Sequence, residues 1–386
     1  MSGANLQRGQ VLLVSAEHGQ ADGVRAVATA AYRRGAKYVD VVYFDPYLKR
    51  ARIEHADGDT LGFVPEWLGA ARVTHAAGHG ARIAFGGVTV PNLLAGLDPD
   101  RLGQDQLPRL KESSQIISDR TTNWCIVPAP HPEWAKLVYP DLAPADAYER
   151  LWSDVEHITR LDEPDPNAAW AARTAVLSES ATRLTERRFD AIQLTGPGTD
   201  LTVGLFRSGS WWAADFTTVD GLRHYPNLPT EEVFTTPDPL RTEGHVTATK
   251  PLVLNDGTII RGLRVRFEAG HAVEIEAAEN GAALRAHLRI DEFATRLGEL
   301  ALVDRLGRIG PLGTVFYDTL IDENAASHIA LGSAYPFVLD DEEDRARANL
   351  SATHVDFMIG SPELEVTGIT VAGERVPVLR GGDWEV

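Results

Sequence analysis

Hydrophobic and polar positions follow two different patterns along the chain, and the change comes near its middle. The first apolar run, GQVLLVSA at 9–16, predicts a buried strand, and apolar residues then recur at helical spacing from Val24 to Tyr32. Gly35 lies where a glycine commonly ends a helix, and KYVDVVYF at 37–44 predicts a second strand. Strand, helix and strand within about 35 residues indicate a βαβ unit and therefore a parallel sheet.

The same pattern continues to about residue 188. Residues 81–85 and 124–128 are strand-like, and residues 145–188 are predicted as helix with a break at LDEPDP. Asp165 stands before Pro166, a pair suited to a helix N-cap followed by the first helical position. These helices carry two tryptophans, for which packing is favoured over shaping a cleft: Trp152 and Trp170.

After Arg188 the chain alternates with period two and contains many glycines and short turns. Strand-like segments recur at 211–215, 232–235, 244–252 and 262–268. Asn255-Asp256-Gly257 is typical of a hairpin turn, and one helix is predicted from Asp291 to Val303. The patterns predict an α/β N-terminal domain with a mostly parallel sheet (1–185). An α+β, β-rich C-terminal domain follows (186–386).

Composition fits this two-domain expectation and excludes several classes of protein. A chain of 386 residues exceeds what one hydrophobic core usually supports. The net charge of −18 argues against nucleic acid or an anionic membrane as the main partner. The start shows no signal-peptide pattern and no run is long enough to span a membrane, so we expect a cytoplasmic protein.

Missing motifs narrow the chemistry further. The chain has no GxGxxG and no GxxxxGK[ST], so a nucleotide site on the N-terminal sheet lacks its phosphate cradle. It also has no HExxH and no GxSxG. The one cysteine, Cys125, lies in an apolar run that indicates an inert buried thiol, and one thiol cannot build a thiolate metal site.

Residues 318–356 set two histidines, a tyrosine and several carboxylates among small and apolar residues. Because unpaired buried charges are costly, a bound cation best reconciles such groups with their surroundings. His354 and Asp356 stand two apart in THVDFMI, so in a strand both side chains point to the same face. This pair suits one metal ion, but a hydrogen-bonded structural pair would look the same. The acidic run DDEED at 340–344 is expected to be a solvated loop and not a site.

Other candidate ligands are weaker by themselves. His328 follows Glu323 by five residues and precedes Tyr335 by seven, where a satisfied core histidine is the alternative. Glu299 lies opposite the apolar stripe of the predicted helix. It is therefore either solvated or, because the helix end is apolar almost all round, in need of a partner. Glu232, with Glu231, opens a strand, where glutamates are usually exposed. Spacing alone leaves a candidate carboxylate-rich metal site.

Longer segments resemble the M29 family of metallo-aminopeptidases, the thermophilic aminopeptidase T and aminopeptidase S group. They are PTEEVFTTPD (229–238), RTEGHV (241–246), RLGELALVD (296–304), DENAASHIALGSAYPF (322–337) and THVDFMIGS (353–361). GPGTDLTVGL (196–205) and LDEPDPNAAW (161–170) resemble the family too, so the resemblance covers essentially the whole chain.

The resemblance implies an enzyme that removes N-terminal residues from peptides with two divalent metal ions per subunit (Zn, Co or Mn). It implies metal-binding roles for Glu232, Glu299, His328, His354 and Asp356. Glu323 matches a further acidic position, either an outer ligand or the general base, and Tyr335 matches the active-site tyrosine. A catalytic C-terminal domain and a homodimer with enclosed active sites are also implied.

The resulting hypothesis is hydrolysis of N-terminal peptide bonds through a metal-activated water. The alternative is a non-catalytic homologue that binds metal or peptide without turnover. A small-molecule transferase built on the N-terminal sheet is a third hypothesis, and the missing phosphate loop counts against it.

Overall fold

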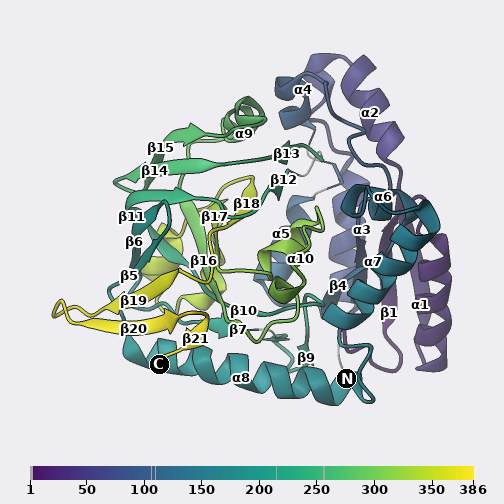
Figure 1. Cartoon of the computed structure of the whole chain (residues 1–386). Coiled ribbons are helices and arrows are strands. Elements are labelled where there is room, and N and C mark those ends of the chain that lie inside the picture. Colours follow the sequence, from purple (N-terminus) through teal and green to yellow (C-terminus); the bar gives the residue numbers. More distant parts are fainter. Residues whose placement is uncertain (1–2, 106, 109, 214, 255–256) are drawn as a thin grey trace. The chain divides into compact units, whose positions relative to one another are not determined.

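The computed structural model describes all residues except 1–2, 106, 109, 214 and 255–256. The chain divides into two compact units (Figure 1). Unit 1 consists of Met1–Ala171 and Asp215–Thr230, and unit 2 of Ala172–Ala214 and Glu231–Val386. The division falls inside the helix Pro166–Arg187, and the later segment Asp215–Thr230 belongs to unit 1. The expected domain boundary after residue 185 stays a prediction, because compact units need not be independently folding domains.

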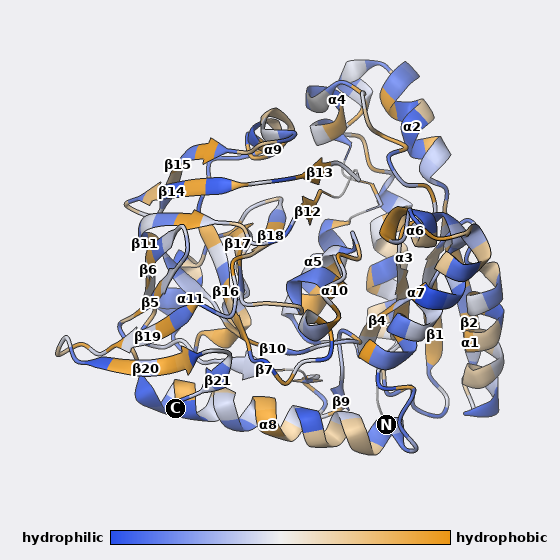
Figure 2. Ribbon diagram, in the orientation of Figure 1, coloured by the Kyte–Doolittle hydropathy of each residue, from blue (hydrophilic) through white to orange (hydrophobic). Residues whose placement is uncertain are grey.

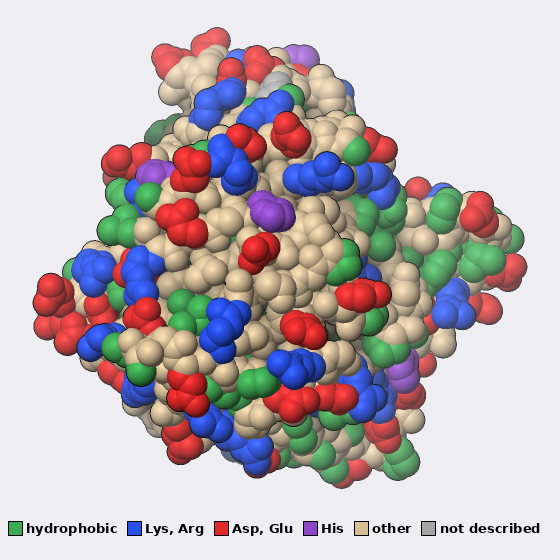
Figure 3. Space-filling view, turned by 60° about the vertical axis from the view of Figure 1, so that its left-hand side comes forward, with side chains coloured by type: hydrophobic (Ala, Val, Ile, Leu, Met, Phe, Trp, Pro, Cys, Tyr) green, Lys and Arg blue, Asp and Glu red, His purple; other side chains and the backbone are tan. Residues whose placement is uncertain are grey.

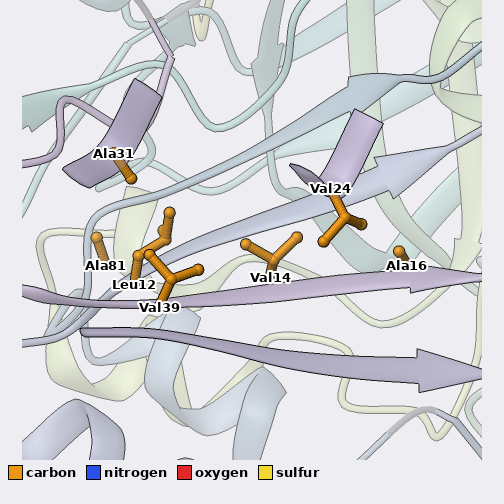
Figure 4. Packing of buried hydrophobic residues seen from close by; sticks show 7 residues of the cluster. All are labelled: Leu12, Val14, Ala16, Val24, Ala31, Val39 and Ala81. Carbon is orange, nitrogen blue, oxygen red and sulfur yellow. The ribbon is translucent and has the colours of Figure 1, made fainter. Parts of the chain in front are cut away.

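Unit 1 contains the predicted parallel sheet. Its order is β2-β1-β3-β4, and each neighbouring pair is parallel. The strands are β1 (Val11–Glu17), β2 (Tyr38–Phe44), β3 (Ala81–Gly86) and β4 (Trp124–Pro128). Helix α1 (Ala21–Arg33) turns Val24 and Ala31 onto β1, where they pack with Leu12 and Val14 (Figure 4). The βαβ prediction is therefore confirmed, and this apolar contact explains it.

Short helices complete unit 1 around this sheet. They are α2 (Pro46–His55), η1 (Gly58–Thr60), α3 (Glu66–Ala77), α4 (Pro99–Gln104), α5 (Lys111–Ser118) and α6 (Pro132–Val138). The strands β8 (Phe216–Thr217) and β9 (Arg223–His224) pair with each other. Cys125 is buried, and burial raises the pKa of its thiol, which keeps it protonated and inert as expected.

The two long helices are α7 (Pro144–Ile158) and α8 (Pro166–Arg187). Asp165 caps α8 as predicted, because its Oδ1 accepts hydrogen bonds from the N–H groups of residues 167 and 168, both at 3.1 Å. Trp170 is a packing residue, 1% exposed, whose indole N–H donates to the Thr159 carbonyl. Trp152 is 40% exposed and contacts Tyr148 edge-on. Apolar and polar residues alternate along α8 (Figure 2).

Unit 2 is β-rich. One sheet has the order β15-β14-β11-β6-β5-β19-β20-β21. Its strands are β5 (Ala191–Gly196), β6 (Thr199–Leu205), β11 (Pro237–Thr247), β14 (Arg264–Glu268), β15 (His271–Glu276), β19 (Glu365–Ile369), β20 (Arg375–Arg380) and β21 (Asp383–Trp384).

A second sheet of unit 2 has the order β18-β17-β16-β10-β7 and is antiparallel throughout. Its strands are β7 (Trp212–Ala213), β10 (Glu232–Thr235), β16 (Leu297–Val303), β17 (His328–Gly332) and β18 (His354–Met358). Short helical segments of unit 2 are α9 (Gly281–His287), η2 (Gly310–Leu312), α10 (Thr319–Glu323), η3 (Pro336–Val338) and α11 (Glu342–Arg347). The four segments predicted as strands after residue 188 each overlap an observed strand.

The predicted helix from Asp291 to Val303 is wrong. Residues 297–303 form the strand β16, and all seven are buried. The sequence LGELALV is apolar on both faces because β16 lies between β17 and β10, and a short run of this kind has no period that separates strand from helix. Glu299 is therefore a strand residue, not a helix residue.

The acidic run at 340–344 is only partly a loop. Asp341 begins α11 by accepting hydrogen bonds from Glu343 N and Asp344 N, so the following carboxylates occupy a first helical turn, where negative charge is favoured. Acidic and basic side chains intermingle over the face seen in Figure 3.

Two further predictions concern the hairpin turn and the membrane. Residues 255 and 256 of the predicted turn lie outside the described residues, while β12 (Leu252–Val253) and β13 (Ile259–Ile260) on either side pair antiparallel. Among the residues described, we find no helix with the length and apolar character needed to cross a membrane.

Candidate metal centre

One face of the five-stranded sheet of unit 2 gathers ligand-type side chains from four strands. Residues directly opposite each other in an antiparallel pair point to the same face. Ala330 on β17 lies opposite both Glu299 on β16 and Asp356 on β18, so the two carboxylates share a face. His328 lies opposite Ala301, two residues from Glu299, and therefore points to that face as well.

The remaining two candidates join the same face. Glu232 on β10 is opposite Val303, two residues beyond Ala301 on β16, and His354 precedes Asp356 by two residues on β18. We call this the ligand face. It consists of Glu232, Glu299, His328, His354 and Asp356.

Small residues make room between the ligand-type side chains. Ala301 and Ala330 occupy the positions between them, so short side chains separate the imidazoles and carboxylates. Gly332, opposite His354, has φ +102°, and a Cβ there would lie 2.2 Å from the Thr353 carbonyl oxygen. Only glycine fits this position.

The imidazole of His354 is oriented by the backbone. Its Nδ1 lies 2.7 Å from the carbonyl oxygen of Ser333, and because a carbonyl only accepts, Nδ1 carries the proton. Its Nε2 then faces Glu299 Oε2 and Asp356 Oδ1, each at 3.2 Å. A ring held in this way presents Nε2 as a ligand atom.

His328 is oriented in the same manner. Its Nδ1 lies 3.1 Å from the Ala326 carbonyl oxygen, which leaves Nε2 3.0 Å from Glu232 Oε2. That carboxylate oxygen is buried, yet no hydrogen bond of good geometry reaches it. A buried carboxylate oxygen without such a donor is the kind of atom that a cation satisfies.

Glu323 reaches the ligand face from a helix and not from the sheet. It ends α10, whose start is capped by Asp318, and its carboxylate lies with Asp356 and His328. Glu323 is buried, and the Asn324 amide lies 3.5 Å from its Oε1.

Tyr335 lies beside the ligand face, before η3. Its ring centroid is 5.4 Å from that of His354 and 5.6 Å from that of Phe234. Its backbone is fixed on both sides by the Thr236 hydroxyl, which donates to the Tyr335 carbonyl oxygen and accepts from its N–H. Burial and the neighbouring carboxylates raise the pKa of the phenol well above 10, so it remains a hydrogen-bond donor.

The pKa values of the acidic groups diverge. Burial, followed by the other carboxylates, raises the pKa of Glu323 well above its usual value. Burial also raises the pKa of Glu299. Burial acts in the same direction on Asp356, but His354 and His328 outweigh it, and the pKa is lowered. Such divergence among neighbouring titratable groups is typical of functional sites.

The imidazoles respond to the same charges. Burial works to lower the pKa of His328, but Glu232 outweighs it and raises the pKa to about 9. For His354, Asp356 and Glu299 likewise outweigh burial and raise the pKa. Each imidazole thus acts as the cation that the carboxylates need when no metal ion is bound.

The donor set fits divalent metal ions. Three groups of three side chains have ligand atoms within 4.8 Å of one another. These groups are Glu232–Glu299–His328, Glu299–His354–Asp356 and Glu323–His328–Asp356. They overlap in Glu299, His328 and Asp356, and together they offer oxygen and nitrogen donors without sulfur.

The structure therefore brings together all seven residues singled out in the sequence. The sequence pattern did not indicate the burial of the first strand of the site. Glu231 and Glu232 are both buried, although glutamates opening a strand are usually exposed. Glu231 meets Arg173, 58 residues earlier, and no local spacing signals that partner.

Comparisons with known proteins agree over the whole chain. The family described as thermophilic metalloprotease (M29) matches residues 1–384. Aminopeptidase T of Thermus thermophilus is 44% identical, with 100% of this chain and 96% of the relative covered. Aminopeptidase 2 of Geobacillus stearothermophilus is 37% identical, covering 99% and 94%. The solved structure of wild-type AmpT from Thermus thermophilus superposes with a TM-score of 0.90 at 42% identity, covering 100% of this chain and 96% of that one.

Proposed function

Because the chain belongs to the M29 family of thermophilic metalloproteases and is a metal-dependent aminopeptidase, we propose that its ligand face holds two divalent ions. The proposed ligands are Glu232, Glu299, His328, His354 and Asp356. The substrates are peptides, and the proposed reaction is hydrolysis of the bond after a free N-terminal residue.

The observation that supports two ions is the charge of the cluster. Four carboxylates, those of the ligand face and Glu323, surround two imidazoles that would be neutral as ligands. Once these four carboxyl groups have lost their protons, two divalent cations balance their charge, whereas one would leave two charges uncompensated. Three overlapping groups of donors also provide more ligand atoms than one tetrahedral ion requires.

The chemistry divides between the ions and the protein. When bound, divalent ions supply Lewis acidity to a carbonyl group and make a water molecule acidic enough to act as a nucleophile near neutral pH. We assign proton transfer to Glu323, because it alone comes from a helix end instead of the sheet and its pKa is raised by burial. It takes a proton from the attacking water and gives it to the leaving amine.

Tyr335 is proposed to stabilise the oxyanion. Its phenol remains protonated beside the ligand face and can donate a hydrogen bond to the oxygen of the scissile carbonyl as negative charge develops there. A donor of this kind commonly contributes about 3 kcal/mol to transition-state stabilisation.

The test is metal content paired with turnover. Purified protein, stripped with a chelator and reloaded with Zn²⁺ or Co²⁺, should bind two equivalents per chain and release free amino acid from an L-aminoacyl chromogenic substrate. Glu299→Gln should lose at least one equivalent and about 10³-fold or more in kcat. Glu365→Gln, an exposed carboxylate on β19 of the same unit, is the matched control and should match the parent protein.

Two outcomes would overturn the proposal. Glu299→Gln with two bound ions and full turnover would remove the ligand assignment. Metal binding without any turnover would instead identify the non-catalytic homologue. The donor set accommodates Zn, Co or Mn. A homodimer and a cytoplasmic location remain predictions, and light scattering on the eluting protein tests the first.

A further inference from the structure

A buried ion cluster lies next to the ligand face within unit 2. The guanidinium of Arg173, on α8, donates through Nε to Glu231 Oε2 at 2.5 Å. Its two terminal nitrogens donate to the two oxygens of Asp304, at 2.9 and 3.0 Å. The side chains of Arg173, Glu231 and Asp304 are 6%, 0% and 1% exposed. A fork of this geometry fixes both carboxylates in direction as well as distance.

The cluster occupies the end of one strand pair of the ligand face. Glu231 directly precedes Glu232, the first residue of β10, and Asp304 directly follows Val303, the last residue of β16. Glu232 and Val303 are opposite each other in the ladder. Arg173 therefore links the residue before β10 to the residue after β16, directly beside Glu232 in the ladder.

The same cluster connects to the helix that carries Glu323. Asn324, the next residue, accepts a 2.6 Å hydrogen bond from Glu231 N through its side-chain oxygen. Its amide nitrogen donates to the Leu320 carbonyl oxygen at 3.0 Å, inside α10. One buried guanidinium thus holds, through Glu231, both the first residue of β10 and the C-terminal end of α10.

Stability alone is a weak reason for such a buried cluster. Buried ion clusters can often be replaced by apolar residues of similar volume without loss of stability, because desolvation costs as much as the pairing returns. Here one guanidinium faces two carboxylates beside a ligand face that is itself rich in carboxylates. Backbone and indole N–H groups also donate to the cluster: Arg308 N to Glu231 at 3.4 Å, and Trp384 Nε1 and Leu306 N to Asp304 at 2.7 and 2.9 Å.

We propose that Arg173 is a positioning residue of the metal centre, which sets the place of Glu232 and Glu323 through Glu231 and Asp304. This inference rests on the proposed function, since it takes Glu232 as a ligand. Arg173 is not among the proposed ligands, because its guanidinium donates to Glu231 and Asp304. Loosening it should weaken metal binding and change turnover, while the fold and the contacts to the peptide remain.

Arg173→Lys is the informative variant, because lysine keeps the charge but cannot donate to Glu231 and Asp304 in the same fork. We expect Zn²⁺ affinity, measured by competition with a chelating dye, to fall about tenfold or more. At limiting Zn²⁺, kcat should fall by a similar factor, KM should stay within twofold, and excess Zn²⁺ should restore most of the turnover. A shift in the visible spectrum of the Co²⁺ protein reports the changed ligand geometry.

Arg305→Lys is the matched control. Arg305 follows Asp304 and pairs with Asp383 at 2.5 Å, but its side chain is 61% exposed, so its replacement should change Zn²⁺ affinity less than twofold. If Arg173→Lys does not fold, the variant Glu231→Gln is used instead. Glutamine keeps the size of the Glu231 side chain and an acceptor for Arg173 Nε, but it removes the negative charge. Its expected effect has the same direction, about threefold.

The inference is overturned if the folded variant has Zn²⁺ affinity and kcat within twofold of the parent protein. It is also overturned if only the melting temperature falls, because that is what a merely structural role would give. The variant Glu232→Gln distinguishes failure of the positioning role of Arg173 from failure of the proposed function. If Glu232→Gln also leaves the metal content unchanged, the ligand assignment itself is wrong. If it loses metal while Arg173→Lys does not, only the positioning role fails.

Discussion

Replacing Glu299 by glutamine should stabilise the metal-free protein while reducing the stability that it gains from metal. The substitution keeps the size of the side chain and an acceptor for His354 Nε2, which lies 3.2 Å from the carboxylate. It removes one of four acidic groups from a buried cluster. Residues that hold a metal ion are often unfavourable without it, so the proposed ligand role of Glu299 opposes its effect on stability.

The magnitude follows from distances within the cluster. Ligand atoms of Glu232 and Asp356 lie within 4.8 Å of Glu299, and at an effective dielectric constant of about 20 each like-charge pair at that distance costs about 3.5 kcal/mol. Protonated His354 at 3.2 Å and His328 within 4.8 Å together return about 9 kcal/mol. The two repulsions, about 7 kcal/mol together, offset most of this attraction, so burial decides the sign, and the pKa of Glu299 is raised. Removing the charge should then stabilise the metal-free protein by about 1–3 kcal/mol.

The effect has a defined pH dependence. A carboxyl group whose pKa is raised in the folded state holds a proton that the unfolded chain releases, so its penalty is absent below the ordinary value of 4.5. The penalty grows as pH rises and becomes constant above the folded pKa. The variant should therefore melt at the same temperature as the parent at pH 4.5 and higher at pH 8. At about 2–4 °C per kcal/mol for a unit of about 200 residues, the rise at pH 8 is about 2–12 °C.

Melting curves recorded after chelation and again with added Zn²⁺ check both halves of this prediction. The parent protein should gain stability on adding Zn²⁺, and Glu299→Gln, which binds at least one ion fewer, should gain less. Glu365→Gln, with an exposed carboxylate, serves as the control and should follow the parent in both conditions. A lower melting temperature for metal-free Glu299→Gln at pH 8, or an undiminished gain with Zn²⁺, would refute the reasoning.

Three further predictions concern single residues. Tyr335→Phe should keep both metal ions and lose about 10²–10³-fold in kcat; turnover within threefold of the parent would exclude a donor role. Gly332→Ala should destabilise the protein by more than about 2 kcal/mol, because its Cβ meets the Thr353 carbonyl oxygen, whereas Gly313→Ala, at φ +64° in open space, should cost about 1 kcal/mol in urea melts. His224 is buried with its pKa lowered to about 4, so the neutral ring contributes stability that is lost as pH falls from 6.5 towards 4. His224→Phe has no ring to protonate, so it should avoid about 3 kcal/mol of this loss of stability, and its melting temperature should fall less than that of the parent between pH 7 and pH 4. An equal fall in both proteins would contradict the burial argument.

Local patterns predict much of unit 1 and less of the second sheet of unit 2. The βαβ unit from Val11 to Phe44 is signalled by residues close in sequence, and its strands and helix lie where the periodicity puts them. The strand 297–303 resembles a helix in sequence because it is buried on both faces, so nothing in its own sequence alternates. Burial on the second face comes from strands distant in sequence, and a local pattern cannot contain that information.

Local sequence patterns are limited in the same way for the candidate metal centre. His354 and Asp356 can be placed together from a period of two, because one strand carries both. Glu232 and His328 meet across strands separated by nearly a hundred residues, and only the family resemblance connects them in the sequence. For Glu299 the expected element is wrong, yet the inference that a carboxylate in apolar surroundings needs a partner agrees with its contact to His354. A buried carboxylate needs a partner whether it lies on a helix or on a strand.

These features explain how a sheet can tolerate so many charges on one face. Among the described residues, the ion pairs of the ligand-face carboxylates run to imidazoles and not to Lys or Arg. The nearby guanidinium of Arg173 cannot neutralise them, because Glu231 and Asp304 already occupy its donors. The metal-free fold must therefore keep protons on this face, on imidazoles and on carboxyl groups with raised pKa values. Under the proposed ligand assignment, metal ions displace those protons, so metal binding should strengthen as pH rises and should stabilise this sheet.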